Sequence, residues 1–177
     1  MTTLSADALR RIDHEIGKYP PDQKQSAVMS ALAVAQDEHG WLSVDVMDAV
    51  AHHLGMPPVA VYEVASFYTM YNLEPTGRYK LTICTNLPYA LQGATAAAEH
   101  LRQRLGIGFN ETTPDRKFTL KEGECFGACG DAPVVLVNNK RMCSFMRPDA
   151  LDGLIAELSA AADRGEGAPL DTARDPA

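Results

Sequence analysis

The sequence has 177 residues, of which 46% are hydrophobic, and a formal net charge of −7. This length allows one domain or two small ones, and the hydrophobic fraction is sufficient for a packed core. The acidic balance argues against a nucleic-acid-binding protein, because such proteins present a basic face to phosphate groups. No apolar run approaches the roughly 18 residues of a membrane-spanning helix, so membrane contact is expected only through a partner.

The N-terminal segment is expected to form a short helix over residues 5–16. It contains Asp7, Asp13 and Glu15 and no continuous apolar segment, which excludes a secretory signal and disfavours a mitochondrial transit peptide. We therefore expect the chain to stay in a reducing compartment, where cysteines at defined spacings more often serve metal or redox chemistry than disulfides.

Apolar residues recur with helical spacing up to about residue 73. Pro20-Pro21-Asp22 is expected to open the first of three further helices, and Gly40 closes it. Ser43 caps the second and Gly55 ends it, while Pro57-Pro58 starts the third, since proline is tolerated in the first helical turn. The apolar positions are Val28, Ala31, Leu32, Ala35, Met47, Val50, Ala51, Leu54, Val61, Val64, Ala65 and Tyr68.

After Gly77 the hydrophobic period changes from 3.6 to 2, which predicts a half-buried strand from Tyr79 to Cys84. An alanine-rich helix is expected over residues 90–105, and a second strand over 118–121.

The β-branched run at 134–137 predicts a strand buried on both faces. Asn138-Asn139 tolerates positive φ and is expected to turn a hairpin into the segment 141–146. Pro148 then opens a last helix, whose inward residues are Leu151, Leu154, Ile155 and Leu158.

The predicted fold class is α+β, with an N-terminal helical bundle followed by a thioredoxin-like α/β domain. The expected domains are residues 1–75 for the bundle and 76–163 for the α/β domain. Residues 164–177 are rich in glycine, proline and charge and are expected to be disordered.

The cysteines carry the strongest chemical signal. Cys84 ends a predicted strand, and Cys125 and Cys129 lie in a loop before the buried strand. The spacing resembles the C-x4-C…C-x3-C framework of a two-iron cluster, in which two thiolates bind each iron, but Tyr89 stands at the second position. The fourth cysteine, Cys143, lies in the predicted hairpin.

Other interpretations of these thiols are open on the residues alone. They could be ordinary buried cysteines, or a redox dithiol, although dithiol chemistry favours C-x-x-C over C-x3-C. Structural zinc needs a fourth nitrogen or sulfur ligand, and no histidine neighbours either half of the pattern. No catalytic residue is predicted. No Gly-rich dinucleotide fingerprint follows a predicted strand, so neither NADH nor FMN is expected on this chain.

Three stretches resemble one family: residues 19–79, from YPPDQKQ to EPTGRY, ICTN at 83–86, and ECFGACGDAPVVLVNN at 124–139. They are similar to the E subunit of bacterial respiratory complex I, the NADH:quinone oxidoreductase, which is related to the mitochondrial flavoprotein 2 subunit. The resemblance covers roughly Tyr19 to Leu158. It implies an electron-transfer subunit of an oxidoreductase and translocase, holding a [2Fe-2S] cluster but no complete active site on this chain alone.

Carried over residue by residue, the resemblance implies that Cys84, Cys125 and Cys129 are cluster ligands and that Tyr89 stands at the fourth ligand position. An iron that lacks one thiolate could bind the phenolate of Tyr89, a water, or Cys143 as a substitute. A cluster-free structural subunit is the alternative.

The resemblance also implies partners. NADH and FMN would bind to a flavin-bearing subunit clasped by the helical bundle, with the cluster close to the FMN and a neighbouring iron–sulfur subunit beside it. Phe67, Tyr68 and Tyr71 are candidates for docking, with core packing as the alternative. The expected location is cytoplasmic, on the inner face of the bacterial membrane. Equivalent subunits of NAD-dependent formate dehydrogenases and NAD-reducing hydrogenases share these features.

Overall fold

The computed structural model describes residues 4–170. The chain forms two compact units that divide after Pro75, and Pro169 and Leu170 group with the first unit. Within the expected tail, the N–H of Ala168 donates to the carbonyl of Arg78 at 2.9 Å, and residues 171–177 lie outside the described residues. No helix in the described part of the chain is long and apolar enough to cross a membrane.

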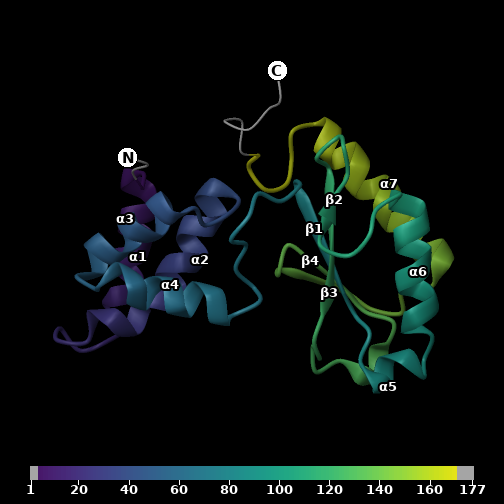
Figure 1. Cartoon of the computed structure of the whole chain (residues 1–177), viewed down its shortest axis with the longest axis horizontal. Coiled ribbons are helices and arrows are strands. Elements are labelled where there is room, and N and C mark those ends of the chain that lie inside the picture. The colour runs from purple at the N-terminus through teal and green to yellow at the C-terminus, as the bar shows by residue number, and fades with distance from the viewer. Residues whose placement is uncertain (1–3, 171–177) are drawn as a thin grey trace. The chain divides into compact units, whose positions relative to one another are not determined.

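The first unit is a bundle of helices (Figure 1), as the apolar periodicity predicts. The Ser5 hydroxyl accepts the N–H of Ala8, and the Ser43 hydroxyl accepts the N–H of Val46, so both serines cap helices. Gly40 and Gly55 adopt left-handed conformations just past two helix ends. The helices are α1 (Ala6–Ile16), α2 (Val28–His39), α3 (Val44–Leu54) and α4 (Pro58–Phe67).

The start of α2 differs from the prediction. Pro20-Pro21-Asp22 does not open this helix; it forms a turn in which the N–H of Gln23 donates to the carbonyl of Pro20 at 2.9 Å. A 3₁₀ turn, Lys24–Ala27, then leads into α2 at Val28. The proline pair starts a turn because neither proline has an N–H to continue a helical ladder.

The aromatic residues at the end of the bundle do not share one environment. Tyr71 is a core residue with 6% exposure, and its hydroxyl donates to the carbonyl of Met29 at 2.8 Å. It therefore follows the core-packing alternative. Phe67 is 78% exposed and Tyr68 is 40% exposed, so both remain available for docking.

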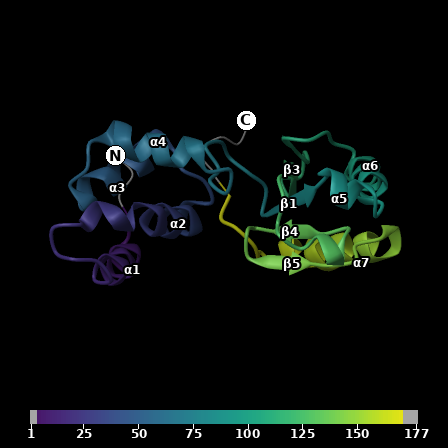
Figure 2. The same cartoon turned by 90° about the horizontal axis from the view of Figure 1, so that it is seen from below.

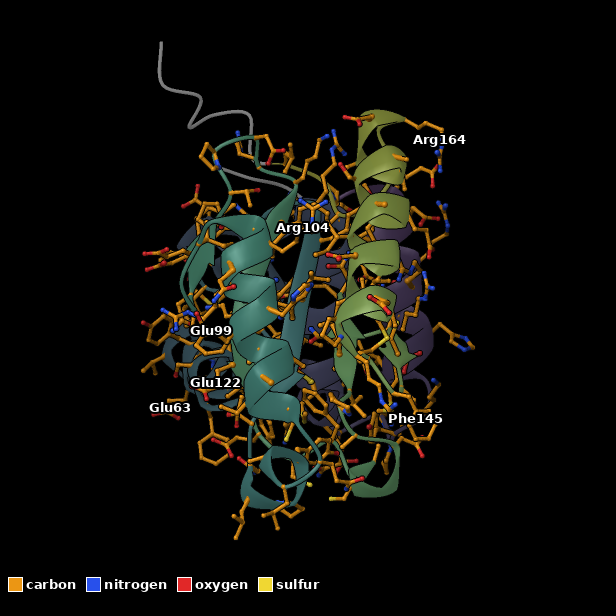
Figure 3. All side chains as sticks on the ribbon, turned by 90° about the vertical axis from the view of Figure 1, so that its right-hand side faces the viewer. Glu63, Glu99, Arg104, Glu122, Phe145 and Arg164 are labelled. Carbon is orange, nitrogen blue, oxygen red and sulfur yellow. The ribbon has the colours of Figure 1, made fainter. Side chains whose placement is uncertain are left out.

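The second unit is a five-stranded sheet in the order β2-β3-β1-β4-β5. Its central strand β1 runs parallel to β3 and antiparallel to β4, and the other neighbouring strands are also antiparallel. The helices α6 and α7 lie side by side on one face of the sheet (Figures 1 and 3). The strands are β1 (Tyr79–Cys84), β2 (Glu111–Thr112), β3 (Phe118–Gly123), β4 (Val135–Val137) and β5 (Arg141–Cys143).

The main core of this unit lies between the sheet and the two helices. Tyr79, Leu81 and Ile83 of β1 pack against Leu101 of α6 and Leu151 of α7. Lys80 and Cys84, which point to the opposite face, are buried too, so most of β1 is buried on both faces. The prediction of a half-buried strand is therefore wrong in this respect.

The predicted helix over 90–105 is confirmed as α6 (Ala94–Leu105), which begins four residues later than expected. A separate short helix, α5 (Leu87–Ala90), precedes it, and Gly93 with φ 92° lies between the two. Pro88 lies in the first turn of α5, a position that proline favours, although this short helix was not predicted. The short strand β2 has no counterpart in the prediction, because two residues carry no periodicity.

The hairpin and the last helix are confirmed. Asn138 and Asn139 have φ of 50° and 58°, and they connect β4 to β5, which lie near α7 in Figure 2. The last helix, α7, spans Pro148–Asp163. Its predicted inward residues, Leu151, Leu154, Ile155 and Leu158, are all buried.

Candidate functional site

The topology of the sheet brings three cysteines to one edge. Cys84 is the last residue of β1 and pairs with Gly123, the last residue of β3. Because these strands are parallel, both chains leave the sheet at the same edge, and Cys125 follows two residues later. Cys129 starts a 3₁₀ turn, Cys129–Asp131, that leads into β4, whose first residue pairs near the end of β1.

Tyr89 joins this group from α5. Its side chain has 0% exposure, and its hydroxyl accepts the N–H of Ala128 at 2.9 Å. Ala128 lies between the two cysteines of the second half of the pattern, so this hydrogen bond joins the two halves directly. The buried residues of this small cluster, here called the cysteine-edge core, are Cys84, Tyr89, Ala94, Ala132 and Val134, with Phe126, Ala128 and Cys129 packed against them.

Cys84 is fully buried in the cysteine-edge core. Burial raises the pKa of its thiol, and hydrogen bonds from the backbone N–H groups of Asn86 and Phe126 act in the opposite direction. These N–H groups provide the sulfur with hydrogen-bond partners from both halves of the site.

The other two cysteines lie closer to solvent. Cys125 is exposed, and its sulfur accepts the N–H of Gly127 at 3.3 Å. Cys129 is partly buried, and its carbonyl accepts a hydrogen bond from the side chain of Gln92 at 2.6 Å. The Gln92 contact links the segment after α5 to the cysteine loop.

The two halves of the site are tied together further at the sheet edge. Thr85 donates a hydrogen bond to Glu122, and the side-chain amide of Asn86 donates to Glu124 at 3.3 Å. A Cβ on Gly123 would lie 2.6 Å from Cγ2 of Thr82 and 2.7 Å from Cζ of Phe126. The absence of a side chain at this position therefore leaves room for those two side chains.

The pKa of Tyr89 is raised above its ordinary value. Burial raises it, while the hydrogen bond from the N–H of Ala128 acts the other way. Burial therefore favours the protonated form of this side chain, whose oxygen already accepts the N–H of Ala128.

Cys143 is not brought to this site. It lies in β5 opposite Val135, and its side chain packs against the core between the sheet and the helices rather than the cysteine-edge core. Burial raises the pKa of its thiol, and the guanidinium of Arg141 opposes that shift. The structure thus groups Cys84, Cys125 and Cys129 with Tyr89 and leaves Cys143 apart.

The donor set does not fit a four-thiolate [2Fe-2S] cluster as it stands. Three thiols are present, but the fourth position is a phenol whose oxygen already has a backbone partner. Among residues 4–170, no three or more histidine, cysteine, aspartate or glutamate side chains are arranged so that they could hold a metal ion. Binding a cluster here would require Tyr89 to leave its position.

Sequence reasoning missed the supporting residues of this site. Ala128 and Gln92 make the two hydrogen bonds that join its halves, yet an alanine N–H and a glutamine in a loop carry no recognisable signal. Gly93 could have indicated the end of α5, since an isolated glycine within a helical pattern often marks a boundary.

Apolar side chains surround the exposed side of the site. Leu87 and Leu91 lie on either side of Tyr89 in the chain and are 72% and 79% exposed. Phe145 is 59% exposed, and the N–H of this residue donates to the carbonyl of Asp131 in the 3₁₀ turn after Cys129. Exposed apolar groups of this size around a functional site favour contact with another protein.

Comparison with known proteins gives a consistent picture. Residues 12–159 match the family described as thioredoxin-like [2Fe-2S] ferredoxin. The chain is 44% identical over 138 residues to the E subunit of NADH-quinone oxidoreductase from Rickettsia conorii, covering 77% of this chain and 83% of the relative. It is 43% identical over 137 residues to mitochondrial NADH dehydrogenase [ubiquinone] flavoprotein 2 of Dictyostelium discoideum, covering 77% of this chain and 56% of the relative.

Among solved structures, the chain is similar to an NAD+-reducing [NiFe]-hydrogenase in the H2-reduced state, with a TM-score of 0.63 and 21% identity. That match covers 82% of this chain and 23% of the hydrogenase chain. At this level of identity the likeness concerns the fold alone.

Proposed function

Because the chain belongs to the thioredoxin-like [2Fe-2S] ferredoxin family, we propose that it is the E subunit of a bacterial NADH:quinone oxidoreductase. The observation that carries this proposal is the extent of the similarity to the Rickettsia conorii protein, at 44% identity over 138 residues. The unit from Thr76 to Ala168 is shorter than this match, so the helical unit shares in the similarity.

In this proposal the chain is an electron-transfer subunit, and a partner binds NADH and FMN. Cys84, Cys125 and Cys129 are the residues that would hold the [2Fe-2S] cluster of the family, with Tyr89 at the fourth ligand position. When bound, such a cluster supplies one-electron transfer. Residues of the chain itself support that site: Gln92 donates a hydrogen bond to the carbonyl of Cys129, and Gly123 leaves room for the side chains of Thr82 and Phe126.

Two surfaces support contact with partner subunits. Leu87 and Leu91 form an exposed apolar pair beside the cysteines, which suits a partner that must come close to the redox site. In the helical unit, a groove of about 780 Å³ is lined by residues that include Trp41, Val44 and Tyr62. We propose that the helical unit binds the flavin-bearing subunit. The assembled complex then lies on the inner face of the cytoplasmic membrane.

Two alternatives to this function are a subunit of another NAD-linked complex and a subunit without a cluster. The relatives at 44% and 43% identity are named as components of NADH dehydrogenases, which favours this complex over a formate dehydrogenase or a hydrogenase. The buried, hydrogen-bonded position of Tyr89 favours the second alternative, a subunit that fulfils a structural role without its cluster.

Co-purification tests the proposed function. An affinity-tagged chain, expressed in its own host, should recover an FMN-containing subunit, and NADH:quinone oxidoreductase activity should appear in the eluate. Deleting the gene should lower that activity in membranes, and the full chain should restore it. Recovery of a formate- or H2-oxidising subunit in place of a quinone-reducing complex would contradict the assignment.

A further inference from the structure

The phenol ring of Tyr89 occupies the interior of the cysteine-edge core. It has the largest volume among the fully buried side chains of the described residues, with 0% exposure. Its neighbours Ala94 and Val134 also have 0% exposure, and Ala132 has 7%, so little space remains around the ring. A residue in this environment contributes to the core in the way that any well-packed aromatic side chain does.

The hydroxyl of Tyr89 makes the connection that a cluster would otherwise make. Metal ligation joins the segment after β1 to the loop after β3 in a four-cysteine site. Here the hydrogen bond from the N–H of Ala128 to Tyr89 joins the same two segments at 2.9 Å. The side chain of Gln92 adds a second link to the carbonyl of Cys129 at 2.6 Å.

Two of the three thiols accept hydrogen bonds from the backbone. The sulfur of Cys125 accepts the N–H of Gly127, and the sulfur of Cys84 receives hydrogen bonds from the N–H groups of Asn86 and Phe126. Backbone hydrogen bonds and the packing of Tyr89 therefore contribute to the conformation of this loop.

Resting on the function proposed above, we propose that Tyr89 replaces the cluster as the structural centre of this unit. The ring and a bound [2Fe-2S] cluster compete for the same space, so the chain is folded and stable while the site is empty. Loading the site displaces the ring from Ala94 and Val134 and breaks the hydrogen bond to Ala128. The chain thereby keeps its fold and its place in the complex without iron, whereas the electron-transfer role proposed above requires the loaded state.

Thermal unfolding of the purified full chain, with and without an iron chelator and a reductant, tests this directly. The wild-type chain should contain far less than one cluster per chain, and its Tm should not change on chelation. A wild-type Tm that falls on chelation, with iron near two atoms per chain, would overturn the proposal. Because this measurement uses only the wild-type chain, its result does not depend on whether a variant folds.

Three variants sharpen the result. Tyr89→Cys, reconstituted anaerobically with iron and sulfide, should rise to about two iron atoms per chain, and its Tm should become chelator-sensitive. Tyr89→Phe keeps the ring but removes the acceptor for Ala128, so its Tm should fall without a gain in iron. Cys143→Ala is the matched control, expected to leave the iron content of both backgrounds unchanged. Equal iron content in wild type and Tyr89→Cys would contradict the competition.

Recovery of the flavin-bearing subunit is measured on the same preparations. Loss of that association with an unchanged, chelator-insensitive Tm counts against the proposed function and leaves the inference about Tyr89 standing. If the wild-type Tm is sensitive to the chelator and the chain still recovers its partner, the inference about Tyr89 is wrong and the proposed function stands.

Discussion

Two buried tyrosines in this chain use their hydroxyl groups in opposite ways. Tyr89 accepts a hydrogen bond from the N–H of Ala128, whereas Tyr71 donates one to the carbonyl of Met29. An accepted hydrogen bond survives deprotonation of the phenol, but a donated one is lost with the proton. Buried phenols of the two kinds should therefore respond differently to alkaline pH.

For Tyr71, we expect a loss of stability at high pH. Burial raises the pKa of Tyr71 to about 12 from its ordinary value of 10.0. The pKa of Tyr71 is thus higher in the folded than in the unfolded chain. The stability that the protonated phenol contributes is therefore complete below pH 10 and is lost as the pH rises from 10 to 12, by up to about 2–3 kcal/mol.

The test compares urea unfolding of wild type and Tyr71→Phe between pH 8 and pH 12. At neutral pH the variant should lose about 1 kcal/mol for the missing hydrogen bond. Between pH 10 and pH 12 its stability should fall less than that of wild type. Tyr19→Phe, at a residue with 40% exposure, is the control and should follow the wild-type profile. Parallel profiles for wild type and Tyr71→Phe would exclude the assignment.

At the scale of the elements, the break between α5 and α6 determines where the cysteine-edge core begins. Ala94, the first residue of α6, belongs to this core, and Tyr89 of α5 faces it across the break. Gly93 makes the change of direction with φ 92°, a conformation that L-amino acids rarely adopt. The position of Tyr89 therefore depends on a glycine four residues away.

A pair of glycine substitutions tests this. Gly93→Ala should destabilise the chain by about 1 kcal/mol or more, since alanine is strained at this φ although no atom lies within 4 Å of its Cβ. Gly153→Ala is the matched control, because Gly153 lies inside α7 and its Cβ also meets open space. There the same change should stabilise the chain by roughly 0.5–1 kcal/mol. Chemical denaturation measures both, and effects of the same sign would contradict the role of Gly93.

For the whole molecule, the exposed apolar residues of α4 define how the helical unit can meet a partner. Val59 is 63% exposed, Tyr62 is 49% exposed and Phe67 is 78% exposed. Within the bundle itself, Val61 and Ala65 of the same helix supply the buried face. The three exposed apolar side chains lie outside the core of the bundle, and apolar groups exposed on one helix favour a protein interface.

Charge placed on this surface should weaken association. Phe67→Asp and Tyr62→Asp should each reduce recovery of the flavin-bearing subunit roughly tenfold or more while leaving Tm within a few degrees of wild type, since both side chains are largely solvent-exposed in the isolated chain. His52→Asp, at an exposed polar position of α3, is the control for the added charge. If all three variants recover the partner equally well, α4 is not part of the interface.

The sequence predicted an element correctly where a long segment of periodic apolar residues ended at a residue that caps a helix or forms a turn. Ser43 and Gly55 delimit α3 as predicted, and Asn138-Asn139 turns the hairpin, because caps and turns act over a few residues and depend little on distant contacts. The family was indicated by the resemblance of residues 19–79, 83–86 and 124–139, whereas the spacing of the three cysteines alone left several interpretations open. Short elements were not predicted: β2 has two residues, and α5 is a four-residue helix that ends before Gly93.

Only the tertiary structure determined the environment of the Tyr89 side chain. The sequence identifies Tyr89 as a departure from a four-cysteine pattern, but it gives no indication of where a phenol would go. The answer depends on contacts between segments far apart in the chain, namely the N–H of Ala128, the side chain of Val134 and the end of β1. The same holds for Cys143, which sequence spacing places near the site and strand pairing turns toward the other core. Local residue preferences determine elements, whereas the environment of a side chain depends on which elements the sheet brings to the same edge.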